Sequence, residues 1–174
     1  YTAGHQQQVT EISGIIAEKM TLPPDRVEAI RISAALHDIG KISVPSEILT
    51  KPSRLTDLER ELVKTHSQNA YDILKAIDFP YTIADIILQH HERMDGSGYP
   101  QGLKGEEILL EARIVAVADV LEAMSAHRPY RPALGIEAAM EEITRHRGLL
   151  YDENVVDACL EIYRENGQKG FLPR

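Results

Sequence analysis

The chain has 174 residues and a formal net charge of -8 at pH 7, and 43% of its residues are hydrophobic. This length suits one domain with a substantial core, and the acidic balance excludes general binding to the phosphate backbone of DNA or RNA. The single cysteine, Cys159, excludes an internal disulfide, and no apolar run is long enough to span a bilayer.

In chain order, the hydrophobic spacing predicts helices and no strand, so the fold class is all-α. Val9, Ile12 and Ile16 recur at intervals of three and four residues, which is typical of an amphipathic helix. Thr56 followed by Glu59 predicts a capping box at the start of a later helix. The expected helices cover residues 5–20, 24–36, 57–66 with a continuation to 77, 82–91, 110–126, 136–146 and 153–166, and a short turn covers 46–49.

Imidazole and carboxylate side chains stand in five groups on five of these helical segments. Taken one at a time, most have an ordinary explanation as a cap or a surface group. Asp119 is harder to explain, because a carboxylate inside an apolar run is costly unless it is paired or metal-bound. Since no cysteine is among them, the groups together favour a polynuclear iron or manganese site over structural zinc. The candidate ligands are His5, His37, Asp38, His66, His90, His91 and Asp119.

A Gly-rich loop over residues 94–105 leaves directly from the paired histidines. One interpretation is a surface connector, since Gly and Pro alone indicate no more. The alternative is a binding loop, in which Gly96 and Gly98 let the backbone approach a ligand and Tyr99 stacks on, or hydrogen-bonds to, a nucleotide. Earlier in the chain, Gly40 is expected to end the second helix in the left-handed conformation.

Two motifs extend over nearly the whole chain and are specific as a pair. They comprise His37-Asp38 with Ile39-Gly40-Lys41, then His90-His91-Glu92, Asp95-Gly96, Gly98-Tyr99-Pro100 and Gly102-Leu103, followed by residues 113–119 and 128–131. At this separation they resemble the motifs of the HD-GYP family, a helical module of bacterial signalling proteins. The resemblance implies an HD-domain bundle of about seven helices and a phosphodiesterase that hydrolyses cyclic di-GMP.

The resemblance also implies the chemistry of the site. It places two divalent metal ions, iron or manganese, on the seven candidate ligands, with Asp38 bridging the ions and Lys41 as the active-site lysine. A hydroxide that bridges the ions is expected to attack phosphorus in line with the departing 3′ oxygen. The product is linear pGpG, and a second cut gives GMP. The implied substrate-binding residues are Gly98, Tyr99, Arg128 and Arg131.

Two positions depart from the family pattern. Some members carry a glutamate one turn before the first ligand histidine, which supports a third metal, and this chain has Tyr1 there. Two metals are therefore expected rather than three. Glu122 keeps the acidic residue that follows the metal aspartate but lengthens its arm. We expect that change to affect contacts at the rim of the site and not the metal ligands.

Residues 1–174 are expected to form one domain of a longer bacterial chain with an N-terminal sensor or receiver domain, located in the cytoplasm and without membrane contact. Besides cyclic di-GMP, the resemblance suggests GGDEF-type or other signalling domains as partners, and a homodimer. Two alternatives remain open at this point. One is a receptor or scaffold that binds the nucleotide without turnover, and the other is a phosphodiesterase or phosphatase for cyclic GMP-AMP or a mononucleotide.

Overall fold

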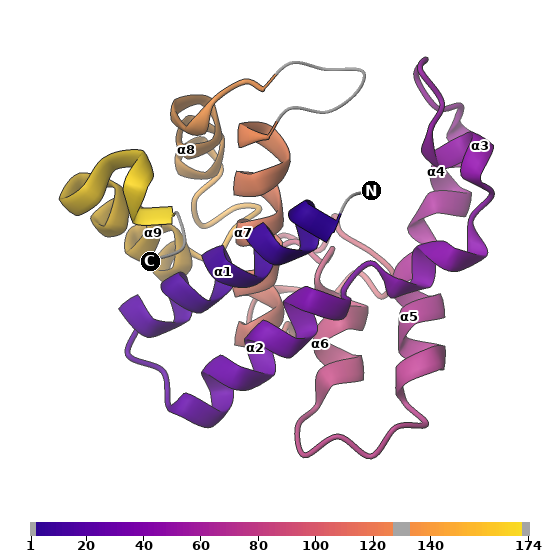
Figure 1. Ribbon diagram of the computed structural model, residues 1–174, viewed down its shortest axis with the longest axis horizontal. Helices are drawn as coiled ribbons and strands as arrows, with labels where there is room; N and C mark the ends of the chain where they lie inside the picture. The colour runs from indigo at the N-terminus through magenta and orange to yellow at the C-terminus, as the bar shows by residue number, and fades with distance from the viewer. Residues whose placement is uncertain (1–2, 127–132, 172–174) are drawn as a thin grey trace.

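The computed structural model describes residues 3–126 and 133–171, and in these residues the fold is helical, as predicted (Figure 1). The predicted segment 57–77 is divided at Thr65 into two helices. The helix predicted over residues 24–36 ends at Leu36, as expected. The helices are α1 (Ala3–Lys19), α2 (Pro24–Leu36), α3 (Ser46–Leu49), α4 (Asp57–Lys64), α5 (His66–Leu74), α6 (Ile83–Gln89), α7 (Leu110–Ser125), α8 (Ile136–Arg145) and α9 (Glu153–Asn166), with 3-10 helices η1 (Ile39–Ser43), η2 (Gly105–Glu107) and η3 (Gly167–Phe171).

Helix α7 forms the centre of the core. Its residues Ile114, Val115, Val117 and Leu121 have no exposed surface, and it contacts α1, α2, α6, α8 and α9. A largely apolar helix is expected in such a position, because neighbouring helices cover most of its surface. None of the described helices is both long enough and apolar enough to cross a membrane.

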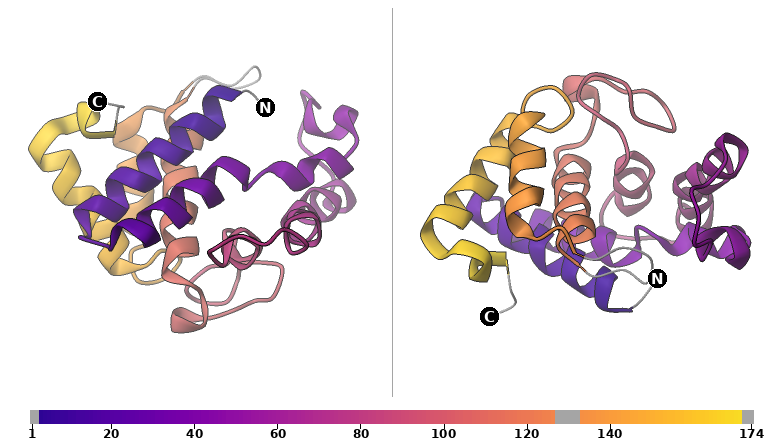
Figure 2. Two further views of the ribbon diagram at one scale, coloured as in Figure 1. Left: turned by 60° about the horizontal axis from the view of Figure 1, so that its bottom comes forward. Right: turned by 90° about the horizontal axis from the view of Figure 1, so that it is seen from above.

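Helices α1 and α2 form an antiparallel hairpin that lies across α7 (Figures 1 and 2). Pro24 occupies the first position of α2, where its missing N–H costs nothing. Because the two helices run in opposite directions, the first turn of α1 and the last turn of α2 lie at the same end of the hairpin. That end holds His5 and His37.

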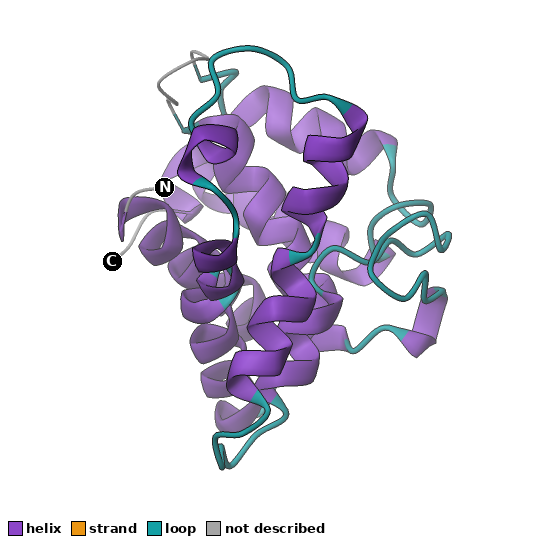
Figure 3. Cartoon of the chain, turned by 90° about the vertical axis from the view of Figure 1, so that its right-hand side faces the viewer, coloured by secondary structure: helices purple, strands orange, loops and turns teal. Residues whose placement is uncertain are grey.

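The other half of the molecule consists of the α5–α6 pair and an arm formed by α3 and α4, which stands away from the body on the right of Figure 1. The predicted capping box opens α4: the Glu59 N–H donates to Thr56 Oγ1 (3.3 Å), and the Thr56 N–H donates to Glu59 Oε2 (2.7 Å). The longest connection between α-helices runs from α6 to α7, and no strand occurs among the residues that the structure describes (Figure 3).

Candidate metal centre

Most of the candidate ligands lie at helix ends. His5 is in the first turn of α1 and His66 begins α5, whereas His37 and His90 are the C-cap residues of α2 and α6. Asp119 differs, because it lies in the middle of α7. Four helices thus carry candidate ligands at or next to their ends, and α7 carries one along its length.

The ligand atoms form two clusters. The His-His-Asp cluster consists of His5, His37 and Asp119, and the three-histidine cluster consists of His66, His90 and His91. Within each cluster the ligand atoms lie within 4.8 Å of one another. Such a spread fits one ion held at about 2.0–2.2 Å from nitrogen and oxygen ligands. Six of the seven candidate ligands therefore fall into two groups, each small enough to hold one ion.

Asp38 lies between the two clusters and is 5% exposed. Its Oδ2 is 3.8 Å from His5 Nε2, and its Oδ1 is 3.6 Å from His37 Nε2 and 3.9 Å from His66 Nε2. Lys41 Nζ lies 2.6 Å from Oδ1 and donates a hydrogen bond to Oδ2 at 2.7 Å. Within the described residues Oδ1 is buried, and its contact with the ammonium lacks hydrogen-bond geometry. An ionised carboxylate has about four lone-pair positions, so the single ammonium leaves positions for a metal ion.

Three imidazoles are oriented by their own chain. The Nδ1 atoms of His37, His66 and His90 lie 2.6, 2.7 and 2.5 Å from the carbonyl oxygens three residues earlier in the chain. A carbonyl only accepts hydrogen bonds, so each Nδ1 carries a proton, and in the neutral form of the ring Nε2 then holds the lone pair. The Nε2 atoms of His66 and His90 are 3.4 Å apart. Metal-bound histidines are oriented in this way.

Glu122 holds the fourth imidazole, contrary to the prediction that it affects only the rim. Its side chain is 4% exposed and makes a short hydrogen bond with His5 Nδ1. His5 Nε2 then faces Asp119 Oδ1 at 3.5 Å. The longer arm of glutamate thus reaches from α7 to the first turn of α1. The prediction failed because α1 and α7 are far apart in the sequence, and the sequence carried no sign that they meet here.

Burial controls the protonation of the three-histidine cluster. It lowers the pKa of His66 below its usual 6.5, and it lowers the pKa of His90 and His91 further, with the neighbouring imidazoles acting in the same direction. Burial acts to raise the pKa of Asp38, but His37 and the Lys41 ammonium outweigh it and hold that pKa well below 3.8. The centre is therefore rich in neutral imidazoles and ionised carboxylate, which is the donor set that iron and manganese accept.

Gly40 has a different role from the predicted one. It does not adopt a positive φ but lies within η1, where a Cβ atom would be 1.9 Å from the His66 carbonyl oxygen and 2.6 Å from the Ala70 nitrogen. Only glycine lets η1 cross the start of α5 at this distance. Lys41 follows Gly40 in η1, and both its ammonium and His66 Nε2 lie within 4 Å of the Asp38 carboxylate.

Of the four predicted substrate-binding residues, the structure describes Tyr99 and Gly98 but not Arg128 and Arg131. Tyr99 lies beside the three-histidine cluster, with its ring stacked on His91. The close approach at Gly98 is made to the backbone of the loop itself. Arg128 and Arg131 lie outside the described residues, as does Tyr1, on which the expectation of two metals depended.

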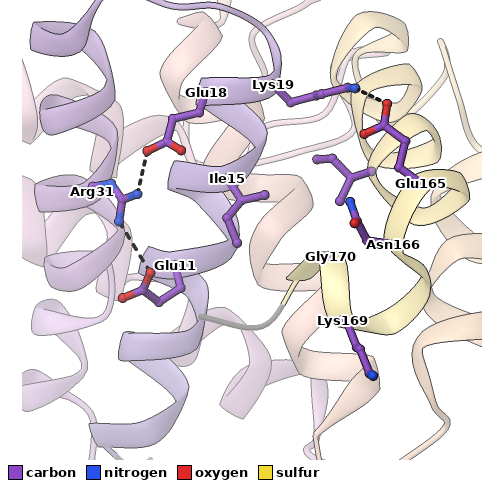
Figure 4. A pocket seen from close by; sticks show the side chains of 10 residues that line it. Glu11, Ile15, Glu18, Lys19, Arg31, Glu165, Asn166, Lys169 and Gly170 are labelled. Atoms are coloured by element: carbon purple, nitrogen blue, oxygen red, sulfur yellow. Dashed lines mark hydrogen bonds and ion pairs between the residues drawn. The ribbon is translucent and has the colours of Figure 1, made fainter. Parts of the chain in front are cut away.

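A hollow of about 530 Å³ lies elsewhere, between α1, α2 and the C-terminal helices (Figure 4). Its Arg31 side chain pairs with Glu18 (3.0 Å) and Glu11 (3.6 Å), and Lys19 pairs with Glu165 (2.7 Å). None of the residues that line the hollow is a candidate ligand, and the nearest of them along α1, Glu11, lies six residues from His5, or about 9 Å at 1.5 Å per residue. The hollow is therefore separate from the metal centre.

The profile of the HD domain family matches residues 2–155. The chain belongs to the HD domain family. Its second motif, with Tyr99 stacked on the candidate ligand His91, agrees with the HD-GYP group that the sequence indicated. A likeness in fold alone links it to Bd1817, an HDG"Y"P protein from Bdellovibrio bacteriovorus, with a TM-score of 0.73 at 20% identity over 92% of this chain and 51% of that one.

Two curated relatives match more closely in sequence. The cyclic di-GMP phosphodiesterase response regulator RpfG of Xanthomonas campestris is 44% identical over 91% of this chain and 43% of its own length. The 3'3'-cGAMP-specific phosphodiesterase 3 of Vibrio cholerae is 41% identical over 80% of this chain and 30% of its own length. The chain thus spans less than half the length of either relative.

Proposed function

We propose that the chain is a phosphodiesterase that hydrolyses cyclic di-GMP with two divalent ions, iron or manganese, as cofactors. The observation that carries the proposal is the position of Asp38, whose buried carboxylate lies between two separate clusters of ligand atoms. A relative with 44% identity is named for this activity. The proposed products are linear pGpG and, after a second cut, GMP.

We assign one metal ion to each of the two clusters. His5, His37 and Asp119 would hold one ion, the three-histidine cluster would hold the other, and Asp38 would contact both. Ions bound there supply Lewis acidity and lower the pKa of a coordinated water. Lys41, which donates to Asp38, places a positive charge beside the carboxylate where the phosphoryl group has to approach.

The remaining contacts with substrate are assigned to the loop and to the segment before α8. Tyr99 and Gly98 are proposed to line one side of the centre, where an aromatic ring suits a guanine base. Arg128 and Arg131 are proposed to meet the substrate phosphates, because guanidinium groups bind phosphate with two parallel hydrogen bonds. Contacts with GGDEF-type domains, a homodimer and a cytoplasmic location stay predictions.

The test is hydrolysis of cyclic di-GMP by anaerobically prepared protein loaded with Mn(II) or Fe(II), followed by chromatography of the nucleotides. The wild type should form pGpG or GMP, and Asp38→Ala, with its folding checked by circular dichroism, should form neither. Equal rates for the two proteins would exclude the metal mechanism. Tight binding of cyclic di-GMP without metal-dependent turnover would assign a receptor or scaffold instead.

A second substrate is cyclic GMP-AMP, because a relative with 41% identity is named for that specificity. Both nucleotides have the same phosphodiester ring, so the metal clusters alone do not distinguish them. The comparison is kcat/KM for the two substrates at equal metal loading. A ratio above one for cyclic di-GMP supports the first assignment, and a ratio below one supports the second.

A further inference from the structure

Five histidines surround the centre, and one of them is held differently from the rest. The ring of His91 lies beyond the end of α6, which stops at Gln89. In the described part of the chain, no hydrogen bond orients either of its ring nitrogens, whereas His37, His66 and His90 each bond to a carbonyl. Something else has to fix the direction of this imidazole if it is to bind a metal.

Packing of aromatic rings provides that support. The His91 ring lies 4.0 Å from the His90 ring and 5.0 Å from the His66 ring, measured between centroids. Its remaining contact is Tyr99, whose ring is stacked on it at 4.8 Å with an interplanar angle of 28°. Two of these three neighbours are themselves candidate ligands. Among these three ring neighbours, Tyr99 is therefore the one that is not itself a candidate ligand.

The loop is built to hold Tyr99 in place. The Tyr99 N–H donates to the His91 carbonyl at 3.3 Å, which turns the loop back on the histidine. Just before it, a Cβ atom on Gly98 would lie 2.4 Å from Glu92 Cα and from the Arg93 nitrogen. Only glycine permits this close return of the chain. The loop thus folds against the residues that follow α6.

Glu92 closes the far end of the loop. Its carboxylate is 3% exposed and accepts the backbone N–H groups of Gln101 (2.7 Å), Gly102 (3.2 Å) and Leu103 (3.0 Å). Hydrogen bonds to an ionised acceptor are about twice as strong as neutral ones. One buried side chain thereby ties the end of the loop to the residue next to His91.

We infer that Tyr99 and Glu92 are positioning residues for the metal ligand His91, in addition to any contact that the loop makes with substrate. The inference rests on the proposed function in one respect, namely that His91 binds a metal ion. Outer partners of metal ligands typically change metal affinity by about 10–100-fold when they are removed. The effect should be confined to the three-histidine cluster, because His5 and His37 are oriented by Glu122 and by the Ala34 carbonyl.

The experiment uses the full chain, no substrate, and Zn(II) as a diamagnetic probe. Long-range 1H–15N spectra of the imidazoles report which histidines coordinate, and competition with a chelator gives the affinity for each ion. Tyr99→Leu should lose the coordination shift of His91 and weaken one of the two ions about tenfold. The shifts of His5 and His37 should stay as in the wild type. Tyr99→Phe, which keeps the ring, should behave as the wild type.

Two matched controls separate this role from general stability. Tyr71 also has a lysine ammonium near its ring, at 5.4 Å against 5.5 Å for Tyr99, but it stacks on no ligand histidine. Glu107 also accepts a backbone N–H, from Lys104 at 2.8 Å, without closing the loop. Tyr71→Leu and Glu107→Gln should leave both ions unchanged, and Glu92→Gln should act in the same direction as Tyr99→Leu.

The inference is overturned if Tyr99→Leu keeps the His91 shift, or if it weakens both ions equally. It is also overturned if the wild type shows no coordination by His91, a result that would count against the proposed metal centre as well. Coordination by His91 that depends on Tyr99, in a protein that hydrolyses no cyclic dinucleotide, would support the inference and contradict the proposed function.

Discussion

The two clusters of the centre differ in what they are built on. The His-His-Asp cluster stands on α1, α2 and α7, which pack against one another in the core. The three-histidine cluster stands on α5, the end of α6 and a loop. In both, a histidine at a helix end is oriented by a carbonyl three residues earlier, as His37 and His66 are. Such a ligand needs no partner from elsewhere in the chain.

Two of the candidate ligand histidines, His5 and His91, are oriented by side chains from other elements. His5 has no residue three positions earlier within α1 and is held by Glu122, 117 residues away in the sequence. His91 has left its helix and is held by the ring of Tyr99. A ligand that no carbonyl three residues earlier orients depends on a side chain from another part of the chain. The predictions below test that difference, beginning with a change that should disable both clusters.

Asp38→Asn should have the largest effect, because it removes charge from the group between the clusters while keeping its size. We expect both ions to be lost from tight binding and hydrolysis of cyclic di-GMP to fall by more than about 100-fold, the upper end for outer partners of a ligand. Elemental analysis and a turnover assay measure the two effects. Retention of both ions by Asp38→Asn would show that the carboxylate does not join the clusters.

Gly40→Ala tests the contact between η1 and α5. The added methyl group would meet the His66 carbonyl at 1.9 Å, so the free energy of unfolding should fall by about 1–3 kcal/mol, as for other overpacked sites. Urea denaturation measures it. In the control Gly148→Ala the methyl meets no atom within 4 Å, and only the φ of +73° is strained, so a loss of about 1 kcal/mol is expected. A smaller loss for Gly40→Ala than for Gly148→Ala would contradict the close crossing.

Glu122→Gln tests the His-His-Asp cluster separately from the three-histidine cluster. The amide keeps the size but loses the charge that fixes His5, so the ion of the His-His-Asp cluster should bind about tenfold more weakly. The ion of the three-histidine cluster should be unaffected, the reverse of the result expected for Tyr99→Leu. Competition with a chelator measures both affinities. Equal weakening of both ions in Glu122→Gln would mean that the clusters are not independent.

The smallest effect is expected from pH on the metal-free protein. The pKa values of His66, His90 and His91 are lowered from 6.5 by burial, so the unfolded chain binds protons in a range where the folded chain does not. Their contribution is fully present above pH 6.5 and is lost as the pH falls towards the folded pKa values. Urea midpoints should therefore decrease from pH 7.5 to 5.5. A midpoint that stays constant or rises over this range would contradict the burial of neutral imidazoles.

Much of the fold followed from local patterns in the sequence. The helix Glu153–Asn166 was predicted at its observed bounds, and the Thr56 capping box was correct, because periodicity and caps are properties of a few adjacent residues. The candidate ligands were also found, since imidazole and carboxylate side chains at helix ends are visible in the sequence itself. Their roles as ligands stay predictions.

The failures have a common physical origin. The left-handed conformation expected at Gly40 was wrong, and the rim role given to Glu122 was wrong. In both cases the residue serves a contact between elements distant in the chain, η1 with α5 and α7 with α1. Glu92 was noticed only as part of a motif. Its three backbone partners, 9 to 11 residues later, depend on how the loop returns, which local propensity does not determine.

The most direct test of the account is anomalous diffraction at the manganese edge from crystals of the Mn(II)-loaded protein. The account predicts two peaks, one within the His-His-Asp cluster and one within the three-histidine cluster, with the Asp38 carboxylate in coordinating contact with both. A single peak, or two peaks of which either lies out of reach of Asp38, would contradict it.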